Sequence, residues 1–219
     1  MNAVTPDLFE SPVEFQGTVP IEPGAVLLRG FAGPHATTLH ADLMRVVAEA
    51  PLRHLVTPGG FRMSVAMSNC GALGWVSDRR GYRYDAIDPD SGRPWPPLPA
   101  SFMQLATQAA AAAGFEGFAP DACLINRYEP GTRLSLHQDR DERDLRQPIV
   151  SVSLGIPAVF LFGGAKRADT TQRIPLGHGD VVAWGGPARL HHHGVLPLKD
   201  AWHPFMGACR INLTFRKAR

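Results

Sequence analysis

The chain has few of the features that would place it outside the ordinary globular proteins. Its 219 residues include only three cysteines, Cys70, Cys123 and Cys209, which are too far apart for a disulfide framework or a zinc site. No apolar run reaches the roughly 18 residues of a membrane span, and no basic segment followed by an apolar stretch opens the chain. We therefore expect a cytoplasmic protein with reduced thiols and no membrane partner. We also expect a monomer.

A strong charge of either sign is also missing. The formal net charge is +2 and the mean hydropathy is -0.10, which permits a phosphate-bearing partner without requiring one. Lysine is scarce, with three lysines among the 22 basic residues. Arginine suits two-point recognition of carboxylate and phosphate groups, but a GC-rich genome produces the same bias, so both explanations stay open.

The composition favours one globular domain over residues 1–219, because 44% of the residues are hydrophobic and such a chain can bury a substantial core. Residues 1 to about 24 are rich in Pro, Glu and Gly and predict an extended arm that leads into a short strand over 25–29. Apolar residues at helical spacing predict a helix over 36–48. A second helix is expected over 101–113, with Gly114 as its C-cap.

Residues from about 50 to 98 contain no clear period and mix Gly, Pro, Trp, Tyr and Arg. A connection of this length inside a compact domain is usually functional, so we interpret it as a lid or binding surface. From residue 121 to about 217, short apolar runs alternate with Gly and Pro, which is typical of many short strands. The fold class is therefore α+β and mainly β, and a jelly roll is the simplest closed arrangement for the strands ACLINRY, RLSLH, IVSVSLG, AVFLFGG, DVVAWGG and RINLTFR.

The segment RLSLHQDRD contains a candidate metal site. In a strand, side chains alternate between faces, so His137 and Asp139 would point the same way and could share one ion. The run from His191 to His193 offers three candidates for a third ligand. Two histidines and one carboxylate with open coordination positions form the facial triad of non-haem iron(II) oxygenases. An H-x-D pair also arises by chance, and a histidine cluster can be a solvated loop. The pair alone therefore does not establish a metal site.

The last strand, RINLTFR, supplies a second pattern. Alternation places Arg210 and Arg216 on one face with Asn212 and Thr214, and leaves three apolar residues for the opposite core. Two buried guanidinium groups are costly without an anion, and a dicarboxylate would satisfy both. The alternative is that Arg216 is solvated.

Together these motifs resemble the AlkB family of iron(II)- and 2-oxoglutarate-dependent dioxygenases, in particular its bacterial DNA-repair members. The resemblance rests on H-x-D, a distant H-G and the closing R-x-N-x-T-x-R. It extends from about residue 20 through VTPGGFRMSVAMSNCGALGW, DACLINRYEPGTRLSLHQDRDE, PIVSVSLG and HGDVVAWGG.

The resemblance implies a double-stranded β-helix core over about 121–217, with N-terminal helices and a nucleotide-recognition lid over about 50–98. It implies that iron(II) is held by His137, Asp139 and His193, where His193 is chosen for its neighbour Gly194 and for the matched spacing. It also implies that molecular oxygen is used and that 2-oxoglutarate is bound by Asn126, Tyr128, Arg210, Asn212 and Arg216.

The implied reaction oxidises 2-oxoglutarate to succinate, hydroxylates the methyl group of 1-methyladenine or 3-methylcytosine, and releases formaldehyde. The implied partner is single-stranded DNA, with double-stranded DNA and RNA as alternatives. Aromatic residues interleaved with arginine in the lid suit base stacking and phosphate contact. The resemblance places the following residues at the substrate: Trp75, Tyr82, Asp141, Arg167, Thr57, Met63 and Met67.

Two rival functions remain open at this point. A relative that acts on tRNA or protein would fit the same iron motif, and the lid discriminates weakly because it suits any polynucleotide. A jelly-roll metal-binding module without turnover is the rival of a different class. The pair Arg210 and Arg216 argues against it, because a structural metal site has no need of a dicarboxylate clamp.

Overall fold

The computed structural model describes residues 16–219. Its larger sheet has seven antiparallel strands in the order β1-β2-β11-β8-β13-β6-β3. These strands are β1 (Gly17–Glu22), β2 (Ala25–Arg29), β3 (Ala66–Gly71), β6 (Ala122–Tyr128), β8 (Ile149–Gly155), β11 (Val181–Trp184) and β13 (Arg210–Arg216). Sheet order and chain order differ strongly, since the last strand lies next to the centre.

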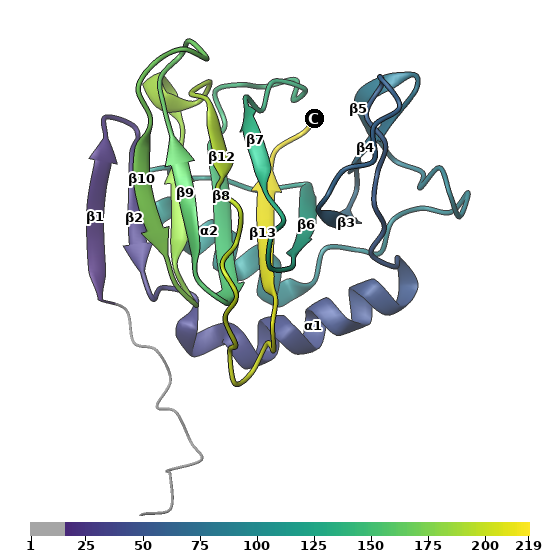
Figure 1. Cartoon of the computed structure of the whole chain (residues 1–219), viewed down its shortest axis with the longest axis horizontal. Helices are drawn as coiled ribbons and strands as arrows, with labels where there is room; N and C mark the ends of the chain where they lie inside the picture. The colour runs from purple at the N-terminus through teal and green to yellow at the C-terminus, as the bar shows by residue number, and fades with distance from the viewer. Residues whose placement is uncertain (1–15) are drawn as a thin grey trace, which may run out of the picture.

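A second sheet lies in front of the first in Figure 1 and has the order β10-β9-β12-β7. Its strands are β7 (Leu134–His137), β9 (Ala158–Phe162), β10 (Gln172–Leu176) and β12 (His193–Val195). Large apolar side chains from both sheets, such as Phe160, Phe162, Trp184 and Ile149, form one core between them. This two-sheet sandwich is the jelly roll that the sequence predicted.

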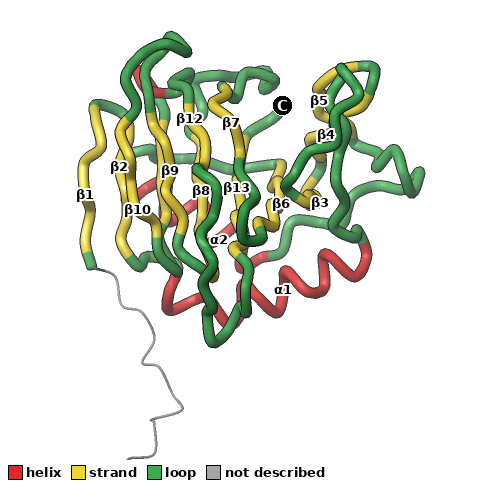
Figure 2. The backbone as a smooth tube through the Cα atoms, viewed as in Figure 1, coloured by secondary structure: helices red, strands yellow, loops and turns green. Residues whose placement is uncertain are grey.

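Helices cover the other face of the seven-stranded sheet, behind and below it in Figure 2. They are α1 (Ala36–Glu49) and α2 (Ala100–Ala112), and two short 3-10 turns, η1 (Gly33–His35) and η2 (Gly186–Ala188), complete the helical part. Helix α1 buries Leu39, Leu43 and Val46, which lie on one face. After α2, Gly114 adopts a φ of +86° and the Phe115 amide bonds the Ala110 carbonyl, so the predicted glycine cap is confirmed.

The lid stretch divides into two parts. Strand β3 pairs along its length with β6 and so belongs to the large sheet, whereas β4 (Gly74–Asp78) and β5 (Gly81–Asp85) form a separate hairpin. Figure 1 shows this hairpin standing to one side of the two sheets. The segment over about 50–98, predicted as a single lid, therefore consists of a hairpin and loops on either side of β3, which belongs to the large sheet.

Two further boundaries differ from the sequence predictions. Residues 17–22 of the predicted arm form β1, while residues 1–15 lie outside the described part of the chain. Strand β7 ends at His137, so Asp139 and Asp141 follow the strand in a loop and do not continue its alternation. Within residues 16–219, no helix is both long enough and apolar enough to cross a membrane.

Candidate active site

Three side chains converge where β7 ends and β12 begins in the smaller sheet. His137 on β7 lies directly opposite His193 on β12, and their ring centroids are 4.4 Å apart. Asp139, in the loop after β7, completes the group, and potential ligand atoms of the three residues lie within 4.8 Å of one another. The ladder between β7 and β12 thus fixes both imidazoles, and the loop returns the carboxylate to them.

The ring orientations suit a metal. His137 Nδ1 is 2.9 Å from the Ser135 carbonyl and His193 Nδ1 is 3.1 Å from the His191 carbonyl, so each Nδ1 can donate its proton there. Each Nε2 then faces Asp139 at 3.7 Å with a free lone pair. Such backbone partners commonly fix the tautomer of a metal-binding histidine.

The electrostatics favour the protonation states that a metal needs. Burial, followed by the neighbouring His137, lowers the pKa of His193 to about 3, so this imidazole is neutral. Burial alone would raise the pKa of Asp139, but Arg216 and the two histidines outweigh it and hold that pKa well below its usual range. A neutral imidazole and an ionised carboxylate are the forms that coordinate a cation.

The other two histidines of the run turn elsewhere. His191 pairs with Glu22 at the end of β1, and His192 Nδ1 lies 3.3 Å from the Gly164 carbonyl. In the described part of the chain, the group of His137, Asp139 and His193 is the one set of three or more potential ligands that could hold a metal. The structure therefore gives the three adjacent histidines different partners, and only His193 faces the metal group. From the sequence, family spacing was the sole basis for choosing among them.

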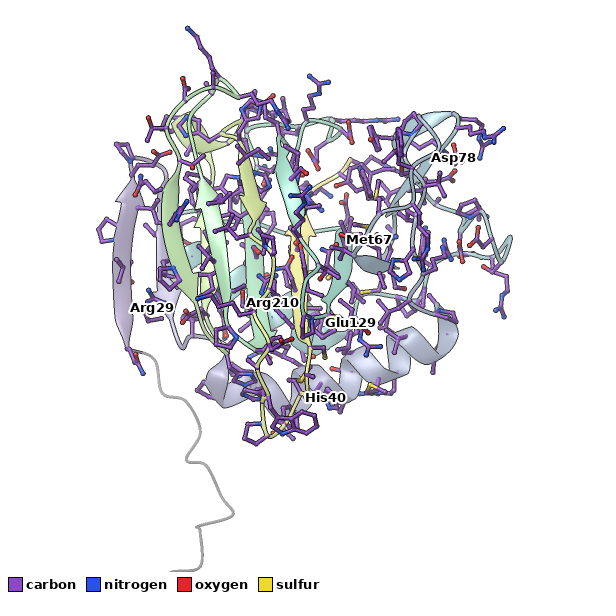
Figure 3. All side chains as sticks on the ribbon, in the orientation of Figure 1. Arg29, His40, Met67, Asp78, Glu129 and Arg210 are labelled. Carbon is purple, nitrogen blue, oxygen red and sulfur yellow. The ribbon has the colours of Figure 1, made fainter. Side chains whose placement is uncertain are left out.

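Strand β13 divides its side chains as its alternation predicted. Ile211, Leu213 and Phe215 join the core under the helices. Arg210, Asn212, Thr214 and Arg216 line a cavity of about 560 Å³ between the sheets, and Figure 3 labels Arg210 among the central strands. Both arginines are nearly inaccessible, so the alternative of a solvated Arg216 is wrong.

The two arginines have different surroundings. Arg216 donates from Nε and Nη2 to Asp139 Oδ2 at 2.9 and 2.7 Å, so the protein's own carboxylate neutralises it. Arg210 meets no carboxylate: Nη2 donates to Ser153 Oγ at 2.9 Å, and the guanidinium lies 5.0 Å from the centre of the Tyr128 ring. The expectation that both guanidinium groups need an external anion is thus corrected, because only Arg210 lacks one.

The same region contains most of the unsatisfied polar atoms. Within residues 16–219, four buried side-chain N or O atoms have no hydrogen-bond partner, and three of them are Arg210 Nε, Arg210 Nη1 and Asn126 Oδ1. Burial lowers the pKa of Arg210, which reflects the cost of an unpaired buried cation. An anionic ligand beside Arg210 would remove that cost.

The mouth of the cavity is aromatic and acidic. Trp75 on β4 stacks on Tyr82 on β5 with ring centroids 5.5 Å apart and planes 12° apart. Its Nε1 donates to Asp141 Oδ2 at 2.9 Å. Every substrate residue expected from the sequence lines this one cavity: Thr57, Met63, Met67, Trp75, Tyr82, Asp141 and Arg167.

Comparison with known proteins gives the family. The pattern of the 2OG-Fe(II) oxygenase superfamily matches residues 24–216. The alpha-ketoglutarate-dependent dioxygenase AlkB of Salmonella typhimurium is 58% identical over 212 residues, which is 97% of each chain. The chain belongs to the AlkB family. It is therefore an iron(II)- and 2-oxoglutarate-dependent dioxygenase that uses molecular oxygen, as the resemblance implied.

More distant members of the AlkB family support the same fold. The solved structure of OsALKBH1 superimposes with a TM-score of 0.81 at 28% identity, covering 92% of this chain and all of that one. The DNA N(6)-methyladenine demethylase ALKBH1C of Arabidopsis thaliana is 29% identical over 93% of this chain, which spans half of that relative's length.

The residues of this AlkB-family site fit iron(II) and 2-oxoglutarate. His137, Asp139 and His193 provide the nitrogen and oxygen donors that iron(II) accepts, and the unpaired Nε and Nη1 of Arg210 offer two donors for a carboxylate. Asn126 and Tyr128 lie on the neighbouring strand β6, directly opposite Asn212 and Arg210. All the co-substrate residues expected from the sequence therefore line one cavity with the metal group.

Sequence reasoning missed a buried polar cluster behind the metal group. Glu142 accepts hydrogen bonds from Tyr84 Oη at 2.7 Å and from Arg189 Nη2 at 2.9 Å, and lies 3.5 Å from Arg216 Nε. Arg189 also donates to the Asp139 carbonyl at 2.7 Å. No local signal marks Arg189, because its partner lies 47 positions away and a single buried pair has no period.

Proposed function

We propose that this AlkB-family dioxygenase repairs DNA by oxidatively removing alkyl groups from damaged bases, with 1-methyladenine and 3-methylcytosine as substrates. We further propose that single-stranded DNA is preferred and that RNA is also accepted. The observation that supports this most is one cavity that combines the metal group, the unpaired guanidinium of Arg210 and a stacked Trp75 at its mouth.

Each part of the cavity has a proposed role. His137, Asp139 and His193 hold iron(II), and Arg210 binds the far carboxylate of 2-oxoglutarate together with Asn126 and Tyr128. Asn212 lies between the two, donating to Ser151 Oγ at 2.8 Å and to the Val152 carbonyl at 3.0 Å, which fixes its amide. Arg216 bonds Asp139 and lowers the pKa of that carboxyl, and it would lie at the metal end of the bound co-substrate.

With iron(II) and oxygen, the co-substrate supplies the oxidising chemistry that converts an N-methyl group to N-hydroxymethyl and yields succinate and carbon dioxide. The hydroxymethyl product then releases formaldehyde and restores the base. The chain's own contribution is placement. A base stacked on Trp75 and facing Asp141 would direct its alkyl group toward the metal group. The buried rings of Trp184 and Phe160 lie beside the His193 ring and give that part of the cavity an apolar wall.

Charge at the mouth supports the choice of lesions. Bases methylated at adenine N1 or cytosine N3 are cationic near neutral pH, whereas those methylated at guanine N1 or thymine N3 are neutral. Asp141 carries a carboxylate next to Trp75, where the stacked base would lie. A cationic base is favoured beside a carboxylate, and more strongly in a site with little water than in bulk solvent. A DNA demethylase among the relatives is consistent with DNA as the polymer.

The decisive assay uses purified protein, iron(II), 2-oxoglutarate and one oligonucleotide sequence carrying 1-methyladenine. Succinate and formaldehyde are followed together, and the same lesion is presented in single-stranded DNA, duplex DNA and RNA. We expect one formaldehyde for each succinate, with the highest kcat/KM on single-stranded DNA. Succinate formed without formaldehyde on all three polymers would refute the proposed substrate while leaving the dioxygenase chemistry intact.

A further inference from the structure

The hairpin β4–β5 is attached to the chain segment that carries the metal-site carboxylate. Trp75 and Tyr84 are direct cross-strand partners in the hairpin, so their side chains leave it on the same face. Trp75 Nε1 donates to Asp141 at 2.9 Å and Tyr84 Oη donates to Glu142 at 2.7 Å. The hairpin thus contacts two consecutive residues that follow Asp139 by two and three positions.

The Tyr84 contact ends in a closed group of four buried charges. Glu142 and Arg189 are 2% and 3% exposed in their side chains, and Asp139 and Arg216 are 10% and 7% exposed. Two carboxylates and two guanidinium groups balance to zero. A buried charge is costly to leave unpaired. If one of these four side chains moves, its partners must therefore move with it to keep their hydrogen bonds.

Glu142 is the member that connects the hairpin to the metal site. Its Oε1 accepts from Tyr84 and lies 3.5 Å from Arg216 Nε, while its Oε2 accepts from Arg189. Arg216 in turn holds Asp139 Oδ2, and Arg189 holds the Asp139 backbone carbonyl. The side chain and the backbone of Asp139 are therefore both linked to Glu142 through one arginine each.

Tyr84 is a donor in this chain of contacts. Burial raises the pKa of its phenol well above the usual value, so the hydroxyl is protonated near neutral pH. The hydrogen bond to Glu142 is therefore charge-assisted and directed one way, from phenol to carboxylate.

From these contacts we infer that Tyr84 and Glu142 are positioning residues that couple the lid hairpin to the occupancy of the metal site. A cation shared by His137, Asp139 and His193 ties residue 139 to β7 and β12, which holds the segment 139–142 in place. The hairpin, bonded to that segment through Tyr84, then opens less often. By reciprocity, a base held against Trp75 stabilises the loaded site by the same factor.

The direct test measures the hairpin without any nucleic acid. Amide hydrogen exchange is compared for Gly74–Asp85 in the metal-free protein and after addition of Mn(II) and 2-oxoglutarate, with amides of β8 and β13 as the reference for loading. In the unaltered protein we expect the hairpin amides to slow by about fivefold or more, the lower end of usual coupling between sites. In Tyr84→Phe we expect less than about a twofold change, although β8 and β13 still respond.

Ser77→Ala provides a matched control on the same hairpin. Ser77 Oγ donates to the Val56 carbonyl at 2.7 Å, so the variant also removes one hydroxyl hydrogen bond of the hairpin, but toward a different segment. We expect Ser77→Ala to retain the response of the unaltered protein. An equal loss in both variants would overturn the inference, because it would show general loosening of the hairpin. So would a full response in Tyr84→Phe.

A second arm separates this inference from the proposed function on which its nucleic-acid half rests. The Kd of a labelled single-stranded oligonucleotide with 1-methyladenine is measured with and without Mn(II) and 2-oxoglutarate, and we expect the ratio to fall toward one in Tyr84→Phe. If no oligonucleotide binds while the hairpin amides respond to metal, the proposed substrate is wrong and the coupling stands. If the oligonucleotide is bound and demethylated while the amides of the unaltered protein ignore metal, the coupling is wrong.

Discussion

The two faces of β13 carry opposite kinds of chemistry on one strand. Ile211, Leu213 and Phe215 face the helices and are almost completely buried among apolar neighbours. Arg210 and Arg216 face the cavity and are buried to a similar degree, yet Arg210 leaves two nitrogens without partners. Similar burial therefore stabilises the fold on the apolar face, whereas on the polar face it leaves Arg210 with a cost that an anionic ligand would remove.

Substitutions in the metal group should have the largest effect. Here the contrast between a face that stabilises the fold and a face that binds ligands should break down, because Asp139 does both. His193→Ala and Asp139→Ala should both abolish metal binding and turnover. Asp139→Ala should also lower the free energy of unfolding by about 3–5 kcal/mol, because Arg216 loses its close carboxylate partner inside the protein. Titration with Mn(II) and urea denaturation of the metal-free variants measure the two effects.

The neighbouring histidines supply the control for that experiment. His191→Ala and His192→Ala should retain metal binding, because His191 pairs with Glu22 and His192 faces Gly164. A metal-dead His192→Ala would contradict the assignment of His193. An Asp139→Ala protein as stable as His193→Ala would show that Arg216 finds another partner.

On the apolar face, Leu213→Ala should destabilise the protein by about 2–5 kcal/mol, the usual range for a leucine truncated in a packed core. Leu213 is fully buried between β8, β6 and the helices. The affinity of the folded variant for 2-oxoglutarate should not change. Urea denaturation gives the first value and calorimetric titration of 2-oxoglutarate below the transition gives the second. A weakened affinity would mean that the two faces are not independent.

On the polar face, Arg210→Ala should give the reverse result. The Kd for 2-oxoglutarate should rise by about 10- to 100-fold, since a charge-assisted contact contributes roughly 1.5–3 kcal/mol. The free energy of unfolding of the ligand-free protein should stay the same or increase, because an unpaired buried cation has been removed. Arg210→Lys should rescue binding poorly, since an ammonium group lacks the planar fork.

The smallest effect is expected at the mouth of the cavity, where the polar face meets solvent. Asp141→Ala should lower kcat/KM by a few-fold, about 1 kcal/mol, for 1-methyladenine and 3-methylcytosine, and less for 1-methylguanine and 3-methylthymine. All four bases are compared in one oligonucleotide. An equal loss for all four would show that Asp141 acts through its hydrogen bond to Trp75 and not through its charge.

The sequence was sufficient where a local pattern coincides with a structural one. The alternation in RINLTFR and ACLINRY predicted β13 and β6 with their observed bounds, and it placed Arg210 and Asn126 in the cavity. Family spacing selected His193 from three adjacent histidines. The strand inference succeeds because a strand side chain has only two possible directions, so the alternation determines its face. The choice of His193 rests on the family resemblance alone and stays a prediction.

Other elements left no such pattern. Strand β1 contains Pro20 and lies in the segment for which the sequence predicts an extended arm, although proline is compatible with a strand at the edge of a sheet. Strand β12 has three residues, which is too short for alternation to be recognised. The contacts of Glu142 with Tyr84 and Arg189 depend on tertiary packing alone. Local sequence therefore predicted the cavity walls but not the polar contacts that connect them.

The position of β13 has a consequence for biosynthesis. It is the last strand in sequence, yet it lies between β8 and β6 in the seven-stranded sheet. During translation β6 and β8 leave the ribosome first and cannot complete the sheet, because the strand that joins them has not been made. Pairing over such sequence separations is slow, and exposed strand edges invite aggregation. The seven-stranded sheet therefore cannot close in the nascent chain, and the edges of β6 and β8 that β13 later covers stay exposed until that strand emerges.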